Sequence, residues 1–427
     1  MHHILIANKE LSTNYEHSEN ILIRGENLFV LKYLFPDFKE KFKCVYIDPP
    51  YNTGRDKLND TLGTHYTDSL EHDVWLNMMK ERIVLLKDFL TEDGTLFIQI
   101  DDNEFARLYL LMTEIFGKSN LKTVCVKMAE PTGVKMRSVV TSGGIPRLKE
   151  YLIIARKSGI KNLAIERVPK KNWDKEYRFL VTGISHSSLM ELKSILNDPE
   201  ATCGSMIQKA NNLASKIRLE SNLNLLYDKY PRLKEKDKIK IKFENAWRIV
   251  RDVSTSITAR KLADEQKEKF AQDCFVILTS RGRKYLIKKN YDAVMEQPRI
   301  RLLFADDYLT YHPGDFWEDI KTTGLDKEGG LPFRMGKKPE ALMKRVIAMS
   351  TVPGDMVLDI FAGSGTTGAV ALKMGRKWVM VERENHVYSH IIPRLNRVIS
   401  GEDKSGVSKV CGFTSGGGFR FYEYQSD

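Results

Sequence analysis

Two separate stretches of this chain alternate short apolar strands with helices, and this alternation constrains the fold more than any other feature. In the first stretch, strand patterns at residues 43–48 and 95–100 flank an amphipathic helix at about 72–90. In the second, strand patterns at 355–360 and 377–382 flank another helix. Strands that alternate with helices in this way predict an α/β fold with a doubly wound, mostly parallel sheet.

The middle of the chain breaks this rhythm. Residues 128–146 are rich in Gly, Thr, Ser and Pro, which predicts a loop. From about 158 to 298 the pattern favours long polar helices, for example at 205–227 and 246–270. We therefore expect one α/β domain made of residues 1–157 and 299–427. A mainly helical domain, residues 158–298, interrupts it.

Charge is concentrated in the same middle region. The chain has 427 residues and a net charge of +11. Residues 121–300 hold 37 Lys and Arg against 20 Asp and Glu, whereas the remainder holds 30 against 36. A basic segment between near-neutral flanks indicates a surface for a polyanion, although solvated, lysine-rich helices have the same composition.

Several other classes of protein are disfavoured. No run approaches the roughly 18 apolar residues that a membrane span needs, and the N-terminal apolar run at residues 4–7 is too short for a signal peptide. The five cysteines are scattered without a CxxC spacing, so we expect no zinc or other metal site. Reduced thiols are typical of the cytoplasm.

The first motif is Asp48-Pro49-Pro50-Tyr51, directly after a predicted buried strand. Ligands of open α/β sheets bind beyond the carboxyl ends of the strands. The two prolines fix the backbone and leave carbonyls as acceptors. Asp48 adds a carboxylate and Tyr51 a flat ring. This set suits an exocyclic amino group on a planar heterocycle, which would donate to Asp48 and to the Pro49 carbonyl and stack on Tyr51.

The second motif, residues 359–367, is a Gly-rich turn between a strand and a helix. An acidic residue, Glu382, ends the next strand 21 residues after Phe361, and at such a spacing it can hold ribose hydroxyls. The turn lacks a full GxGxxG and is not a P-loop. It therefore indicates an adenosine-containing cofactor with no requirement for phosphates. The candidate cofactor residues here are Asp359, Phe361, Ala362, Gly363, Ser364, Gly365, Thr366 and Glu382.

A third, weaker motif is Lys337-Lys338-Pro339, which opens a predicted helix at 339–350. A helix N-terminus with nearby cations suits a carboxylate. Such a helix start is common in proteins without a ligand there, so Lys338 and Pro339 are not assigned to a ligand on this pattern alone.

The DPPY and FAGSG motifs together resemble the amino-group DNA methyltransferases that use S-adenosylmethionine. The order DPPY, basic insertion, KP and FAGSGTT is similar to the β class of adenine-N6 methyltransferases, and most of all to type III restriction–modification Mod subunits. The resemblance runs through residues 20–34, 46–54, 95–104, 338–382 and 398–424, and not through 158–298. Typical Mod subunits are considerably longer, so a solitary or type II methyltransferase stays open.

This resemblance implies a class I S-adenosylmethionine-dependent methyltransferase fold and direct transfer of a methyl group to a flipped-out adenine, with S-adenosylmethionine as cofactor and no metal. Asp48, Pro49 and Tyr51 would hold the adenine and Pro50 would shape the loop. The Gly-rich turn and Glu382 would line the cofactor site, with Lys338 and Pro339 nearby. The implied partners are double-stranded DNA, a restriction (Res) subunit and a second copy of the chain. The implied location is the cytoplasm of a bacterium or archaeon, at the nucleoid.

The basic insertion would recognise the target DNA. Phosphate contacts from Lys and Arg would supply most of the affinity, and fewer side chains would read base edges. The candidates are Lys135 and Arg137 in the 128–146 loop, and Arg281, Arg283 and Lys284; each of them also fits a solvated surface charge. Cytosine-N4 methylation, a catalytically silent DNA-binding subunit, and an RNA or protein methyltransferase remain alternatives.

Overall fold

The computed structural model describes residues 3–53, 57–59, 64–66, 70–131, 134–230, 232–292, 294–333 and 336–426. The chain forms two compact units. The first combines Met1–Glu166 with His312–Asp427, and the second is Arg167–Tyr311. These bounds lie later in the chain than the predicted ones. The first boundary moves because the Ala164 N–H donates to the Met349 carbonyl, which ties residue 164 to the first unit. The second boundary moves because strand Arg301–Phe304 pairs with a strand of the second unit.

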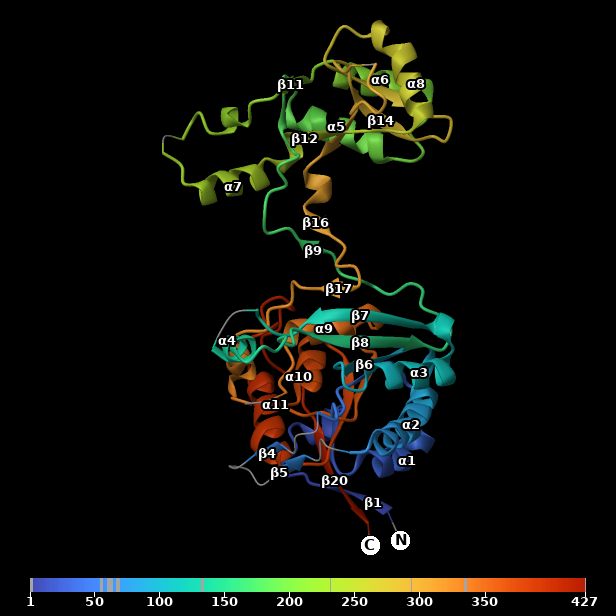
Figure 1. The fold of residues 1–427 in the computed structure, drawn as a ribbon, viewed down its shortest axis with the longest axis vertical. Helices are drawn as coiled ribbons and strands as arrows, with labels where there is room; N and C mark the ends of the chain where they lie inside the picture. Colours follow the sequence, from blue (N-terminus) through green and yellow to red (C-terminus); the bar gives the residue numbers. More distant parts are fainter. Residues whose placement is uncertain are drawn as a thin grey trace. The chain divides into compact units, whose positions relative to one another are not determined.

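A ten-stranded sheet forms the centre of the first unit (Figure 1). Its strands β20, β2, β19, β18, β3 and β6 run parallel, whereas β8 is antiparallel to both of its neighbours. In spatial order the strands are β1 (His3–Ala7), β20 (Arg420–Ser426), β2 (Ile21–Arg24), β19 (Lys377–Glu382), β18 (Met356–Asp359), β3 (Phe42–Ile47), β6 (Leu90–Ile100), β8 (Lys149–Arg156), β7 (Leu121–Lys127) and β17 (Phe316–Trp317).

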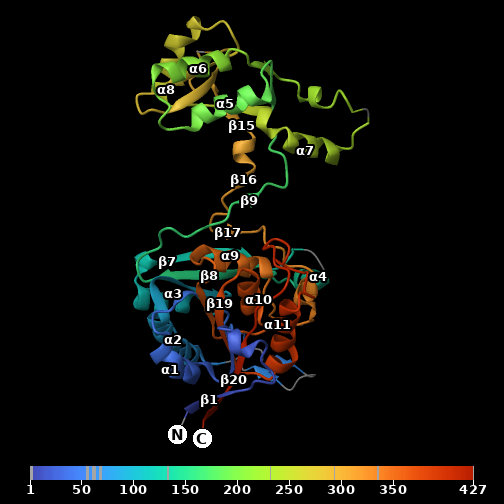
Figure 2. The ribbon, with the colours of Figure 1, turned by 180° about the vertical axis from the view of Figure 1, so that it is seen from behind.

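Helices cover both faces of this sheet (Figures 1 and 2). Because strand residues alternate between faces, Tyr46 of β3 packs into one core and its neighbour Val45 into the other. The predicted doubly wound, mostly parallel α/β fold is confirmed. The helices on one face are α1 (Asn27–Phe38), α2 (His72–Phe89) and α3 (Phe105–Phe116), and those on the other are α9 (Glu340–Ser350), α10 (Thr366–Lys373) and α11 (Ile392–Ile399).

The sheet topology brings the two sequence motifs together. Strands β3 and β18 are parallel neighbours, with Val45 opposite Leu358. The DPPY loop follows β3 and the FAGSG loop follows β18, so both loops leave the same edge of the sheet side by side. This is the edge where ligands bind in open α/β sheets.

The second unit contains a six-stranded antiparallel sheet, which corrects the expectation of a mainly helical segment. The helices expected at 205–227 and 246–270 both include strands, because β-branched residues such as Ile249 and Val250 fit a buried sheet. The strands are β11 (Arg218–Glu220), β10 (Phe179–Thr182), β12 (Ile249–Val253), β15 (Arg301–Phe304), β14 (Lys284–Lys288) and β13 (Cys274–Leu278), with helices α5 (His186–Asn197), α6 (Gly204–Ala214), α7 (Glu235–Glu244) and α8 (Ile257–Gln266).

Smaller elements complete the description. The expected loop at 128–146 contains a short helix, α4 (Val134–Thr141). Two short strand pairs join β4 (Lys57–Asn59) to β5 (Thr64–Tyr66) and β9 (Val168–Pro169) to β16 (Thr310–Tyr311). No described helix combines the length and the apolar character of a membrane-spanning segment.

Candidate active site

The loop after β3 is held from both sides. The indole N–H of Trp75, on α2, donates to the Pro50 carbonyl at 2.8 Å. Asn52 adopts a left-handed backbone conformation with φ 55°, which asparagine tolerates better than most residues. Its side-chain amide donates to the buried Glu104 at 2.7 Å. The loop therefore presents Asp48 at the edge of the sheet from a fixed backbone.

A compact polar cluster surrounds Asp48. The Tyr51 hydroxyl lies 2.6 Å from Asp48 Oδ1 and 2.9 Å from Glu150 Oε2. Lys338 Nζ donates to the Tyr51 hydroxyl at 2.8 Å and lies 3.1 Å from each carboxylate. It also lies 5.0 Å from the centre of the Tyr51 ring. The structure thus places Lys338, which the sequence assigned to the cofactor, against the DPPY side chains.

The ionisation of this cluster is coupled. Burial raises the pKa of Asp48, and the charge of Glu150 adds to that rise, whereas the charge of Lys338 opposes it. Burial also acts to raise the pKa of Glu150, but Lys338 and the hydrogen bonds from Gln99 and Tyr51 outweigh it and leave that pKa lowered. The two carboxylates together raise the pKa of Lys338 despite its burial. The ammonium is therefore retained between them.

Three members of this cluster were not found from the sequence. Tyr46 donates to Gln99 Oε1 at 2.6 Å, which turns the Gln99 amide N–H towards Glu150. Glu150 is the second residue of β8, and its side chain is 19% exposed. One signal was available: Gln99 is the single polar residue in the apolar run 96–100, and a buried polar group needs a partner.

The loop after β18 is braced from within by Asp359. Its carboxylate accepts the Phe361 backbone N–H at 2.9 Å and the Thr367 hydroxyl. Burial raises the pKa of Asp359 to about 7. Both of these contacts lie inside the loop and the first turn of α10, so Asp359 shapes the turn.

The two glycines of this loop differ in their surroundings. Both have positive φ, 52° at Gly363 and 73° at Gly365, which favours glycine. A Cβ on Gly363 would find only the Phe361 carbonyl, 3.9 Å away, among the described atoms within 4 Å. A Cβ on Gly365 would lie 2.9 Å from Ile391 Cγ2. The surface beside Gly363 is open to a ligand, whereas Ile391 fills the space beside Gly365.

We expect Gly365→Ala to destabilise the protein by roughly 2–4 kcal/mol, because it combines left-handed strain with a clash against Ile391. Gly363→Ala is the matched control and should cost roughly 1–2 kcal/mol from backbone strain alone. Urea unfolding of both variants measures the difference. Equal losses would show that the contact with Ile391 adds nothing to the strain.

Glu382 connects the ends of β18 and β19. Its Oε2 accepts the Gly363 backbone N–H at 2.8 Å, and its Oε1 accepts the N–H groups of Arg383 and Glu384 at 2.9 and 3.1 Å. The structure therefore brings Glu382 directly against the Gly-rich loop. This is the position in which an acidic residue at the end of the second strand reaches a ribose.

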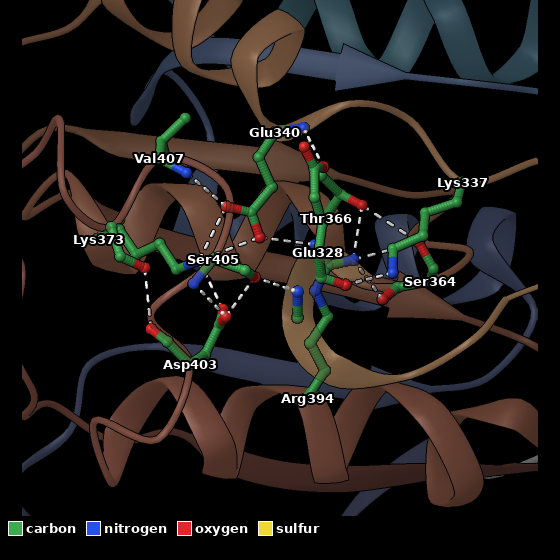
Figure 3. Close-up of polar contacts among 12 residues, drawn as sticks. Glu328, Lys337, Glu340, Ser364, Thr366, Lys373, Arg394, Asp403, Ser405 and Val407 are labelled. Atoms are coloured by element: carbon green, nitrogen blue, oxygen red, sulfur yellow. Dashed lines mark hydrogen bonds and ion pairs between the residues drawn. The ribbon is translucent and has the colours of Figure 1, made fainter. Parts of the chain in front are cut away.

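A buried network of charges supports the other side of the loop (Figure 3). Arg394, on α11, donates to the Thr366 hydroxyl at 2.7 Å, to the Ser364 carbonyl at 3.2 Å and to Glu340 at 2.8 Å. Glu340 also accepts from Lys373 at 2.8 Å. Ser364 and Thr366, both candidate cofactor residues, therefore have contacts to Arg394 beneath the loop.

The start of α9 already has a protein carboxylate. Pro339 caps the helix, and the Glu340 backbone N–H donates to the Glu328 carboxylate at 2.9 Å. Lys337 donates to the Glu328 and Leu331 carbonyls. The sequence led us to expect a carboxylate at the start of this helix. At the first N–H of the helix, that of Glu340, the carboxylate belongs to Glu328.

The predicted DNA-contacting residues have different environments. Arg281 and Arg283 are exposed on the turn between β13 and β14, where Gly282 has φ 75°. Lys284 is 7% exposed and donates to the Asp198 carbonyl, so its selection as a DNA contact was wrong. The cause is strand alternation, which turns Lys284 inwards. Arg137 is exposed on α4, and the side chain of Lys135 lies outside the described residues.

No group of three or more His, Cys, Asp or Glu among the described residues is arranged to hold a metal ion.

Comparisons with known proteins place the chain in a family. Residues 42–393 match a family model described as DNA methylase. The chain is 31% identical to the HindVI Mod subunit of a type III restriction–modification enzyme from Haemophilus influenzae, over 95% of this chain and 54% of that one. It is 26% identical to the EcoPI Mod subunit of Escherichia phage P1, over 85% and 56%. The type II methyltransferase M.KpnI of Klebsiella pneumoniae is 25% identical, over 88% and 83%.

The fold is the α/β arrangement that the resemblance implied. Because the family model spans most of the sequence, the chain belongs to the DNA methylase family. It resembles type III Mod subunits, and it spans about half the length of the two named above.

Proposed function

We propose that this chain transfers the methyl group of S-adenosylmethionine to the N6 amino group of adenine in double-stranded DNA. The observation that carries the proposal is the juxtaposition of two loops: DPPY follows β3, and FAGSG follows the neighbouring parallel strand β18. A target base and a cofactor bound by these loops meet at one edge of the sheet. Because the N6 atom lies inside the duplex, the adenine must be flipped out to reach Asp48.

The residues of the second loop fit the cofactor. The open surface beside Gly363 admits a ligand to the backbone, and the Glu382 carboxylate lies next to it. When bound, S-adenosylmethionine supplies a methyl group on a positively charged sulfur. Phe361, Ala362, Gly363 and Glu382 would contact it, with Pro339 nearby. The other candidate residues would shape the loop, through their contacts with Thr367, Arg394 and Ile391: Asp359, Ser364, Gly365 and Thr366.

The first loop supplies the groups for the target. Asp48 and the Pro49 carbonyl would accept the two N–H bonds of the amino group, and the ring of Tyr51 would stack on the base. This raises electron density on the nitrogen. The lone pair of the nitrogen would form the new bond to the methyl carbon, the electron pair of the broken carbon–sulfur bond would stay on sulfur, and one proton would pass from the nitrogen to solvent water. Catalysis consists mainly of positioning these partners.

We further propose that the chain is the modification component of a restriction–modification system. The similarity to the HindVI and EcoPI Mod subunits supports this. A restriction (Res) subunit is then its partner, a second copy of the chain completes a homodimer, and the cytoplasm is the place of action. The similarity to M.KpnI supports the related proposal of a methyltransferase of the type II kind.

Identification of the methylated base tests the proposal. Unmethylated plasmid DNA is incubated with the protein and S-adenosylmethionine, digested to nucleosides and analysed by mass spectrometry. N6-methyladenine is the expected product. N4-methylcytosine would reassign the target base. If no modified base forms and calorimetry detects no binding of S-adenosylmethionine, the chain is a DNA-binding subunit without activity.

The second unit is the proposed DNA-recognition surface. It holds 29 Lys and Arg against 19 Asp and Glu, a net charge of +10. The hairpin turn with Arg281 and Arg283 presents two of these cations to solvent. Exposed cations contribute to DNA affinity mainly through phosphates, and that contribution falls as salt rises.

We expect the double variant Arg281→Ala/Arg283→Ala to weaken DNA binding. The negative slope of log affinity against log salt should become less steep by about 1.8, because two phosphate contacts are lost. Lys9→Ala removes an exposed cation of the first unit and is the control. Fluorescence anisotropy at several salt concentrations measures both slopes. An unchanged slope in the double variant would remove this hairpin from the DNA surface.

A further inference from the structure

Glu150 is the least expected member of the cluster around Asp48. It lies on β8, an antiparallel strand separated from β3 by β6. Its Oε2 atom accepts hydrogen bonds from the Gln99 amide, the Tyr51 hydroxyl and Lys338 Nζ. Each of the last two donors also contacts Asp48. Glu150 therefore competes with Asp48 for the same two donors.

The charges of the cluster show what this competition achieves. Asp48, Glu150 and Lys338 together carry two negative charges and one positive charge. Without Glu150, the Lys338 ammonium would pair with Asp48 alone, and the net charge of the cluster would be zero. With Glu150, the cluster keeps one net negative charge, and Lys338 within it is only 8% exposed. At such burial a neighbouring charge acts more strongly than it does in water.

We propose that Glu150 is a positioning residue for methyl transfer, which shares Lys338 and the Tyr51 hydroxyl with Asp48 so that the cluster keeps a net negative charge beside the target amino group. This rests on the proposed function. As the amino nitrogen forms its bond to the methyl carbon, positive charge appears on that nitrogen. A cluster with a net negative charge stabilises that positive charge more than an isolated pair of Asp48 and Lys338, whose net charge is zero.

The neighbouring groups define the expected pH behaviour. The ionisable groups facing Asp48 and Glu150 are Lys338 before α9, Tyr51 and Tyr46 around β3, Asp101 after β6 and Asp359 after β18. Removing the charge of Glu150 should lower the pKa of Asp48, because a like charge is lost. Removing the charge of Lys338 should raise that pKa, because the opposite charge is lost. The two changes should therefore move the acidic limb of the pH–rate profile in opposite directions.

The experiment compares Glu150→Gln, Lys338→Met and the double variant in the full chain, by incorporation of labelled methyl groups into unmethylated plasmid DNA. Each single variant should lose about tenfold or more in kcat at neutral pH. The acidic limb should move to lower pH in Glu150→Gln and to higher pH in Lys338→Met. The double variant, which removes both the negative charge of residue 150 and the positive charge of residue 338 from beside Asp48, should be more active than either single variant.

One further readout separates base flipping from methyl transfer. Fluorescence of 2-aminopurine at the target position reports base flipping, and it should persist in Glu150→Gln. Wild-type kcat with an unmoved acidic limb in Glu150→Gln would overturn the proposal, as would a double variant with additive losses. If Glu150→Gln folds poorly, an unmoved limb in Lys338→Met overturns it instead. Failure of the proposed function differs from these results, because the wild-type protein itself then leaves DNA unmethylated.

Discussion

Asp48→Ala should lower DNA methylation by at least about 1,000-fold, because the variant loses the carboxylate that accepts the target N–H and stabilises the charge developing on the nitrogen. The backbone of the loop should keep its shape, because Trp75 still donates to the Pro50 carbonyl and Asn52 still donates to Glu104. DNA affinity and binding of S-adenosylmethionine should therefore stay close to those of the wild type. Radiolabelled methyl transfer, DNA anisotropy and calorimetry measure the three quantities.

Asp93→Ala is the matched control for this substitution. Asp93 is an exposed aspartate of β6 that pairs with Lys43 near the opposite end of the neighbouring strand β3. Its loss should leave methylation within about twofold of the wild type, because exposed ion pairs contribute little. Methylation by Asp48→Ala at near wild-type rate would refute the catalytic assignment. Equal losses of DNA affinity and methylation would instead make Asp48 a residue for DNA binding.

The sequence predicted the architecture well for buried strands, because each of them is a short contiguous run of apolar residues. The run at residues 377–382 is strand β19 with the same bounds, and residues 43–48 overlap β3 almost completely. Strands of a parallel sheet are covered on both faces, so they appear as short apolar runs. Because the motifs follow these runs directly, their place at the carboxyl edge of the sheet could also be predicted.

Contacts between distant segments could not be predicted in the same way. Glu150 and Lys338 are separated by 188 residues, and nothing local to either position indicates the other. The same limit applied to Lys284, which belongs to a basic run and yet points into the second unit. In the second unit, alternation within short strands was mistaken for the pattern of polar helices. A short strand of four or five residues is too brief to be distinguished reliably from a helix by periodicity alone.

Lys373→Met should produce the largest loss of stability among the changes considered. The Lys373 side chain is fully buried, and it lies 2.8 Å from Glu340 and 2.6 Å from Asp403. Methionine matches the apolar stem, but both buried carboxylates lose this cation, and of the two only Glu340 keeps another one, Arg394. Removing one partner of a buried ion pair costs about 3–5 kcal/mol. Urea unfolding followed by circular dichroism measures the change in the free energy of unfolding.

The effect should also reach the cofactor loop, because Glu340 binds both Lys373 and Arg394, and Arg394 donates to the Ser364 carbonyl. Weaker binding of S-adenosylmethionine by Lys373→Met, measured by calorimetry below the unfolding transition, is therefore expected. Lys377→Met is the control, since Lys377 is 40% exposed and pairs with Glu19 at the surface, where such pairs contribute about 0–1 kcal/mol. If both variants lose the same stability, the buried network does not support the fold. If only stability falls and cofactor affinity is unchanged, Arg394 holds the loop without help from Lys373.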